Sequence, residues 1–163
     1  MSQLSLPQLN LPALLEEYRR GTLLLREAFN DVAPDRLHQT PTDGSWTLHQ
    51  IAIHLVDSDL TGSVRMKRVA CMDKPPLIGF DESAMASLSG NEKIPLALAL
   101  DLFDLNRQAT LIVLEALPEE AFARTGLHNE AGELNLRDLV EKFVKHLHHH
   151  LEFVEKKKRS PQG

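Results

Sequence analysis

Residues 140–157 read VEKFVKHLHHHLEFVEKK, and four of the eight histidines of this 163-residue chain fall within five positions of this stretch. A histidine run close to a C-terminus can be an expression tag. Here Leu147 interrupts the run, and apolar residues continue at helical spacing on both sides of it. We therefore interpret the stretch as native sequence in an amphipathic helix.

The four histidines divide into two sets when each residue is advanced by about 100° around the helix axis from Leu136. His146 at about 280° and His150 at about 320° fall within the apolar arc, whereas His148 and His149 fall among the charged residues. Two imidazoles four residues apart lie about 6 Å apart along one face, close enough to share a divalent ion. The same pair is also compatible with a position at a hydrated end of the bundle, or with hydrogen bonds to the backbone and to other side chains.

A third ligand is expected from another helix, and His54 in SWTLHQIAIHLVDSDLTGSVR is the candidate. Its helical position places it on a polar strip, which either faces solvent or lines a cleft. Asp57, one turn further on, has the spacing of a carboxylate that orients the imidazole, although an ordinary surface pair has the same spacing. The other members of the strip are Ser58, Thr61 and Arg65.

The remaining histidines are expected to be structural. His38 and His128 lie in loop sequence, and His49 lies near a helix start among residues of exposed type. Trp46 is expected to pack on the core just before the helix cap. Cys71 is the only cysteine, which excludes an internal disulfide framework, and it is expected to be a small buried apolar residue.

Four segments have the apolar spacing of core-facing helices, at about residues 11–30, 47–72, 94–117 and 136–157. Together they predict an all-α protein, a four-helix bundle that forms a single domain over residues 1–163. The Pro- and Gly-rich segment 73–93 is expected to be a long connection with one helical turn at DESAMASL. RTGLHNEAGEL is expected to be a loop or a short hairpin, and no segment predicts a strand of any length.

Composition and charge exclude several classes of function. The chain has 42% hydrophobic and 25% charged residues, which is ordinary for a globular protein. Its formal charge is -5 and it has no basic stripe, so no nucleic-acid partner is expected. No stretch approaches the about 18 apolar residues of a membrane span, so no membrane role is expected. The single cysteine and the lack of a signal sequence in MSQLSLPQLN predict a cytoplasmic location.

Three segments, in their order and spacing, resemble the DinB/YfiT-like superfamily of four-helix-bundle proteins. They are SWTLHQIAIHLVDSD, GFDESAMA and GELNLRDLVEKFVKHLHHHLEFV, and the resemblance extends from residue 11 to residue 155. It implies a divalent ion, nickel or zinc, held by His54, His146 and His150. Some members have their histidine pair at the positions of His149 and Phe153. Since Phe153 cannot bind a metal, His149 is only a second-choice ligand.

Three neutral imidazoles leave an open position on an ion, as in catalytic rather than structural zinc sites. The resemblance implies that the ion activates water or a low-molecular-weight thiol, which predicts a hydrolase or a thiol S-transferase acting on a small molecule. The expected site-lining residues are Asp57, Ser58, Thr61 and Arg65, of which Arg65 suits an anionic substrate. No general base is evident, so either metal-bound solvent would act without one, or a group of the long connection, such as Asp81 or Glu82, would have to help.

The alternative is a non-catalytic, stress-related binding or interaction protein in which the metal is structural or absent. A homodimer formed through helix faces is compatible with either hypothesis. The two hypotheses share the bundle and differ in whether the three histidines hold a functional ion.

Overall fold

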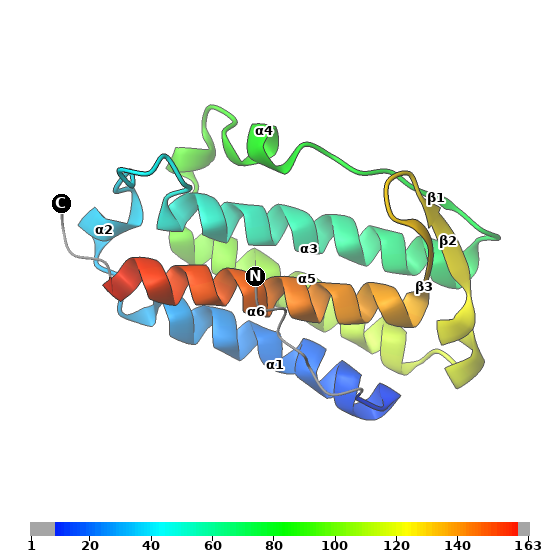
Figure 1. Cartoon of the computed structure of the whole chain (residues 1–163). Coiled ribbons are helices and arrows are strands. Elements are labelled where there is room, and N and C mark those ends of the chain that lie inside the picture. Colours follow the sequence, from blue (N-terminus) through cyan, green and yellow to red (C-terminus); the bar gives the residue numbers. More distant parts are fainter. Residues whose placement is uncertain (1–8, 160–163) are drawn as a thin grey trace.

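The computed structural model describes residues 9–159, which form four long helices with a small sheet at one end (Figure 1). The long helices are α1 (Leu11–Asn30), α3 (Leu48–Cys71), α5 (Leu96–Glu115) and α6 (Leu136–Arg159). The short helices are α2 (Pro34–Leu37), α4 (Glu82–Ala86), η1 (Asn91–Lys93) and η2 (Glu119–Ala123). The strands are β1 (Pro76–Leu77), β2 (Thr125–His128) and β3 (Gly132–Asn135). The predicted all-α four-helix bundle is confirmed, while residues 1–8 and 160–163 of the predicted domain lie outside the described residues.

Local sequence signals set the starts of the first two long helices. The side chain of Asn10 accepts a hydrogen bond from the backbone N–H of Ala13 at 3.0 Å. Thr47 and Gln50 form the predicted capping box, in which each side chain accepts from the backbone N–H of the other at 3.0 and 2.9 Å. The long helices therefore begin close to the positions that the sequence predicts.

The order of the helices around the bundle differs from a simple up-and-down arrangement. α1 packs against α5 and α6, and α3 packs against the same two helices. α3 and α5 run in one direction, whereas α1 and α6 run in the other (Figure 1). Two parallel neighbours cannot be joined by a tight turn, so the segment between Met72 and Pro95 returns along α3. The predicted long connection is thus a crossover, and it lays α4 against α3.

Three short strands cover the end of the bundle where α3 ends and α6 begins (Figure 1). β1 pairs with β2 in parallel, and β2 pairs with β3 antiparallel. RTGLHNEAGEL is therefore a short hairpin, one of its two predicted alternatives, although no segment predicted a strand of any length. Each strand has two to four residues, which is too short for an alternating pattern to appear in the sequence.

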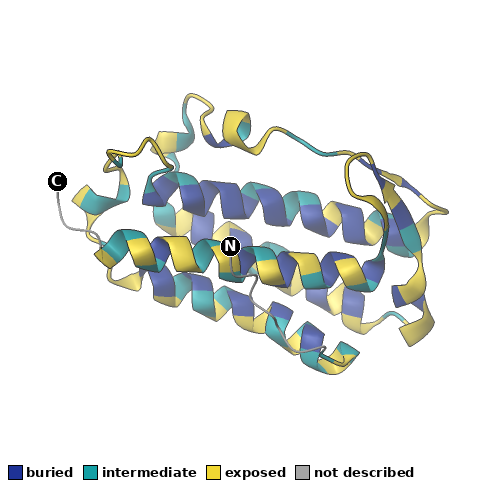
Figure 2. Cartoon of the chain, in the orientation of Figure 1, coloured by how far each residue is buried: buried dark blue, intermediate teal, exposed yellow. Residues whose placement is uncertain are grey.

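The core consists of two apolar clusters, one toward each end of the bundle. Leu25, Leu55 and Phe103 belong to the first cluster, and Met66 and Val140 belong to the second. Figure 2 shows that the buried residues follow the helix faces that are turned toward one another. Cys71, which was expected to be buried, is exposed at the end of α3. No helix within residues 9–159 has the length and apolar character needed to cross a membrane.

Between the clusters, one buried guanidinium of α5 is hydrogen-bonded to the other three long helices. Arg107 of α5 donates through Nη2 to Oδ2 of Asp59 in α3 at 2.7 Å. It also donates to the carbonyls of Tyr18 in α1 and Phe143 in α6, each at 3.1 Å. The Tyr18 hydroxyl donates to Asp59, and burial first, then Asp59, raises the pKa of Tyr18 so that this proton stays in place. Gly21 leaves room for the guanidinium, because a Cβ there would lie 2.1 Å from Nη1 of Arg107.

We expect Asp59→Ala to lower the free energy of unfolding by about 3–5 kcal/mol, because it leaves Arg107 buried without its carboxylate. Urea denaturation of the metal-free protein measures this loss. Glu16→Ala is the control, since it breaks the exposed pair of Glu16 and Arg19 and should cost less than about 1 kcal/mol. A loss for Asp59→Ala as small as that of the control would show that the buried pair does not hold the bundle together.

Candidate metal centre

Three histidine side chains meet between α3 and α6. Nε2 of His54 lies 3.0 Å from Nε2 of His146 and 3.1 Å from Nε2 of His150. Each ring offers one nitrogen, and these atoms all lie within 4.8 Å of one another. His54 is buried and the other two are half-buried. The structure thus brings together the three residues that the sequence and the family resemblance selected.

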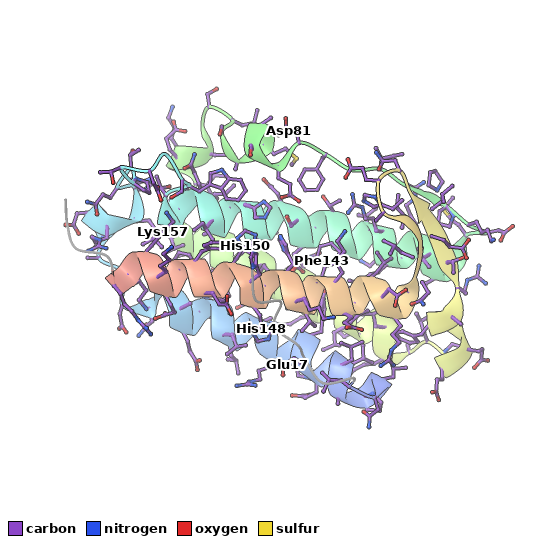
Figure 3. The ribbon with its side chains drawn as sticks, viewed as in Figure 1. Glu17, Asp81, Phe143, His148, His150 and Lys157 are labelled. Atoms are coloured by element: carbon purple, nitrogen blue, oxygen red, sulfur yellow. The ribbon has the colours of Figure 1, made fainter. Side chains whose placement is uncertain are left out.

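The two histidines predicted to face outward do not join this cluster. Nε2 of His148 lies 2.9 Å from Oε1 of Glu17, and Figure 3 shows this pair on the side of α6 that is turned toward α1. His149 is exposed and contacts the ring of Phe153 at a centroid distance of 4.8 Å. The rotation of α6 that the sequence predicts therefore agrees with the structure at all four positions.

The geometry of the three nitrogens suits a cation better than hydrogen bonds among the rings. A neutral imidazole carries one N–H and one lone pair, so three converging nitrogens cannot all be satisfied by one another. Nδ1 of His150 is also buried without a hydrogen-bond partner among residues 9–159. A divalent ion accepts a lone pair from each ring. The residues present therefore fit a metal ion.

Burial keeps the three rings in the protonation state that metal binding requires. Desolvation lowers the pKa of His54 to about 4. Desolvation, followed by the neighbouring histidines, lowers the pKa of His150 to about 3 and that of His146 to about 2. Each ring is therefore neutral near pH 7, and its lone pair is available to a metal.

Trp46 lies against two of the three rings. Its ring centroid is 4.7 Å from that of His54 and 6.1 Å from that of His150, with an interplanar angle of 14° to the latter. The predicted contact of Trp46 with the core is also present, but it describes only part of the environment of the indole. Because Trp46 is the only tryptophan of the chain, its fluorescence reports on the histidine cluster.

Two hollows reach the histidines from different sides and share no lining residue. The larger, of about 670 Å³, reaches His150 and has Trp46 and Phe153 in its wall. The smaller, of about 90 Å³, reaches His146 and has Arg65 and Glu82 in its wall. A small molecule therefore has two routes to the cluster.

Two of the four predicted site-lining residues, Ser58 and Arg65, line the smaller hollow. Asp57 and Thr61 are half-buried, and the Thr61 hydroxyl donates to the carbonyl of Asp57 at 2.9 Å. Burial raises the pKa of Asp57. Within residues 9–159, the hydrogen bonds of His54 go to the other two histidines, so the orienting role considered for Asp57 has no counterpart among these contacts.

Glu82 of α4 brings a carboxylate to the cluster. Its Oε2 lies 3.9 Å from Nε2 of His54. Asp81, the other acid that the sequence suggested, accepts from the backbone N–H of Ala84 at 2.9 Å and caps α4 (Figure 3). Glu82 is therefore the acid that the crossover presents to the site.

The other histidines have structural partners. His38 lies in a turn after α2, as predicted, whereas the predicted surroundings of His49 and His128 were wrong. His49 is buried rather than exposed, and its Nε2 lies 2.8 Å from the carbonyl oxygen of Ile94. His38 stacks on His49 with a centroid distance of 4.5 Å. His128 lies buried in β2 rather than in a loop, and its Nδ1 accepts from two backbone N–H groups of the hairpin turn. The sequence places His49 beside the apolar residues Leu48 and Ile51, and this apolar neighbourhood could have predicted its burial.

We expect His146→Leu to leave the free energy of unfolding of the metal-free protein within about 1 kcal/mol of wild type, or to raise it, because leucine replaces a poorly satisfied buried imidazole. His49→Leu should lower it by about 1–3 kcal/mol, because the carbonyl of Ile94 loses its donor. Urea denaturation in the presence of a chelator compares the two. An equal loss in both variants would mean that His146 supports the fold.

Comparison with known proteins identifies the family of this chain. The family model of the DinB superfamily matches residues 17–154. A protein of Oceanobacillus iheyensis with the name "Putative metal-dependent hydrolase" is 25% identical over 131 residues, which cover 80% of this chain and 76% of that protein. YfiT of Bacillus subtilis, which has the same name, is also 25% identical over 131 residues, covering 80% of this chain and 74% of YfiT.

The solved structure of YfiT, described as a probable metal-dependent hydrolase with an unusual four-helix bundle topology, has the same fold. It superposes with a TM-score of 0.86 at 21% sequence identity, covering 98% of this chain and 91% of the YfiT chain. The family match includes the segments that carry His54, His146 and His150. The chain belongs to the DinB superfamily.

Proposed function

We propose that this protein is a metal-dependent enzyme in which His54, His146 and His150 hold one divalent ion, nickel or zinc. The observation that carries the proposal is the convergence of three Nε2 atoms between α3 and α6. When bound, such an ion lowers the pKa of water or of a thiol and so supplies a nucleophile at neutral pH. Two relatives carry the name metal-dependent hydrolase, and this supports the same proposal.

The surrounding side chains would control what reaches the ion. Trp46 covers two of the ligand rings and forms part of the wall of the larger hollow, so it would shape the route from that side. Glu82 is close enough to His54 to receive a proton from a nucleophile at the site. Asp57, Ser58, Thr61 and Arg65 are proposed to line the site, with Ser58 and Arg65 nearest to the smaller hollow.

Hydrolysis of a small-molecule substrate is the reaction that we propose first. Transfer of a low-molecular-weight thiol is the second candidate, and the volume of the larger hollow favours it. A hollow of about 670 Å³ is within the range of sites for drug-sized ligands and has room for a thiol beside an electrophile. Such thiols are kept reduced in the cytoplasm, the location that the single cysteine predicts and that stays a prediction.

Adding Ni²⁺ to the metal-free protein should quench the fluorescence of Trp46 and saturate at one ion per chain, because the indole lies 4.7 Å from the ring of His54. His146→Ala should weaken binding by at least about tenfold, since it removes one of three ligands. His149→Ala is the matched control on the same helix and should bind like wild type. Quenching that does not saturate, or that His149→Ala weakens as strongly, would argue against a site at these histidines.

Turnover with the loaded protein tests the reaction itself. The substrates are 4-nitrophenyl acetate, and 1-chloro-2,4-dinitrobenzene with or without cysteine. We expect activity that a chelator and His146→Ala remove and that His149→Ala retains. Turnover without a thiol supports the hydrolase, and turnover that requires cysteine supports the transferase. A bound ion with no turnover would favour the non-catalytic alternative, in which the metal is structural.

We also propose that α5 mediates a homodimer. Its outer face carries an exposed apolar stripe at spacings of four, three and seven residues, which is the spacing of a helix that pairs with another helix. The exposed fractions are 57% for Leu98, 40% for Leu102, 63% for Leu105 and 69% for Ile112. No other part of residues 9–159 covers this stripe.

Leu105→Glu should therefore convert a dimer into a monomer, because it places a charge within the paired apolar stripe. Light scattering coupled to size-exclusion chromatography measures the mass. Leu127→Glu is the control, because Leu127 is exposed to a similar extent (57%) but lies in β2. A monomeric wild type, or a dimer that persists in Leu105→Glu, would contradict the proposal.

A further inference from the structure

Two residues that line the smaller hollow each carry a buried hydrogen-bonding atom that no group within residues 9–159 satisfies. The two atoms are Oγ of Ser58 and Nε of Arg65, in side chains of residues that are 4% and 8% exposed. Both residues line the hollow together with His146. Buried polar atoms normally have partners, because an unpaired one costs free energy. Two of them in one wall, next to the histidines, indicate a place for a ligand.

Arg65 is unlike the other buried arginine of the bundle. The charge of Arg107 is balanced by Asp59 at 2.7 Å. Arg65 forms no ion pair with a carboxylate of the described residues, and its Nη2 donates to the carbonyl of Ile78 in the crossover. Burial lowers the pKa of Arg65 and outweighs Glu130 and Glu82, which are exposed and act favourably on its charge from a distance. A bound anion in the hollow would give the buried guanidinium a close counter-charge.

The charges around the hollow favour a ligand with one negative charge over a ligand with two. Glu82, Glu130 and Lys142 also line the hollow, and all three are exposed, so water and salt screen them. Arg65 is buried and its field is screened much less. His128 contributes no positive charge near pH 7, because burial first, and then Arg65, lowers its pKa. A monoanion therefore gains from Arg65 against weak repulsion from the two glutamates, whereas a second negative charge would double that repulsion without a second buried cation to balance it.

We propose that this hollow binds the carboxylate of a substrate, with Arg65 and Ser58 as its donors. The proposal rests on the proposed function, since the reacting part of the same molecule would lie at the histidines. The volume of the hollow, about 90 Å³, is roughly three times the volume that one molecule occupies in liquid water, and this suits a carboxylate group. Because both donor atoms are sealed from solvent, binding requires a small shift of the crossover at Ile78.

Acetate titrated into the metal-free protein should give saturable amide shifts around the hollow in nitrogen-15 NMR spectra. The expected Kd is on the order of millimolar for a ligand of so few atoms. Arg65→Gln should weaken binding by at least about tenfold, and Ser58→Ala by about threefold. Lys67→Gln is the control, because it removes the same charge from an exposed position of α3 outside the hollow.

Arg65→Lys serves as a second variant in case Arg65→Gln does not fold. It keeps the charge but lacks the Nε donor, and should bind acetate less tightly than wild type. Inorganic phosphate at equal ionic strength should bind more weakly than acetate. Three results would overturn the proposal: no saturable shift, equal weakening by Lys67→Gln, or tighter binding of phosphate.

Nickel-loaded protein tests the connection between the hollow and the histidines. We expect 3-mercaptopropionate to bind at least about tenfold more tightly than uncharged 2-mercaptoethanol, and Arg65→Gln to remove this difference. Equal binding of the two thiols in wild type would overturn the assignment of the hollow to the substrate of this site. The acetate titration needs no metal, so a protein that binds acetate but no ion would refute the proposed function and not the anion site.

Discussion

The hydrogen bonds of Arg107 determine how the four long helices are placed relative to one another. The guanidinium is bonded to Asp59 of α3 and to the carbonyl of Phe143 in α6, and each bond tolerates little sliding of a helix along its axis. His54 lies five residues before Asp59, and His146 lies three residues after Phe143. The bonds that seat the guanidinium therefore also fix the register that brings the three imidazoles together. The hydrogen-bonded groups around Arg107 form a polar layer between the two apolar clusters. Because apolar residues lie on either side, water is excluded from this layer and its hydrogen bonds are strengthened.

The histidine cluster is a place where the requirements of the fold and of the site differ. His49 shows what a structural histidine looks like in this bundle, since it is buried and its Nε2 has a backbone partner. His150, in contrast, has a buried nitrogen without a partner within residues 9–159, and three ring nitrogens converge that cannot all be satisfied by hydrogen bonds among themselves. Poorly satisfied polar groups reduce stability, and they persist where the surrounding packing is strong enough to hold them. This contrast is a physical argument for a functional cluster that does not depend on resemblance to relatives.

The sequence predicted those parts of the structure in which a periodic pattern is long and has a polar side. α6 has charged residues on one side over its whole length, so its rotation assigned all four histidines correctly. The surroundings of His54 were harder to predict from its own helix. Most of α3 is buried, and a polar strip by itself does not show whether it lines a cleft or faces solvent. The Arg107 layer was missed because a helical pattern treats arginine as exposed, although Arg107 occupies the stripe between Phe103 and Leu111. The strands were missed because they are too short to show a period.

The crossover explains how one fold combines a rigid histidine cluster with an adaptable wall beside it. The three histidines come from α3 and α6, whose positions are fixed by the core, so their geometry is preset. Glu82 and Ile78 come from the crossover, which exists because α3 and α5 are parallel and must be joined over the length of the bundle. A loop tolerates changes in sequence and position better than a packed helix does. Changes in the crossover would therefore alter the wall of the smaller hollow while leaving the imidazoles in place, and differences in substrate among relatives are expected in this segment.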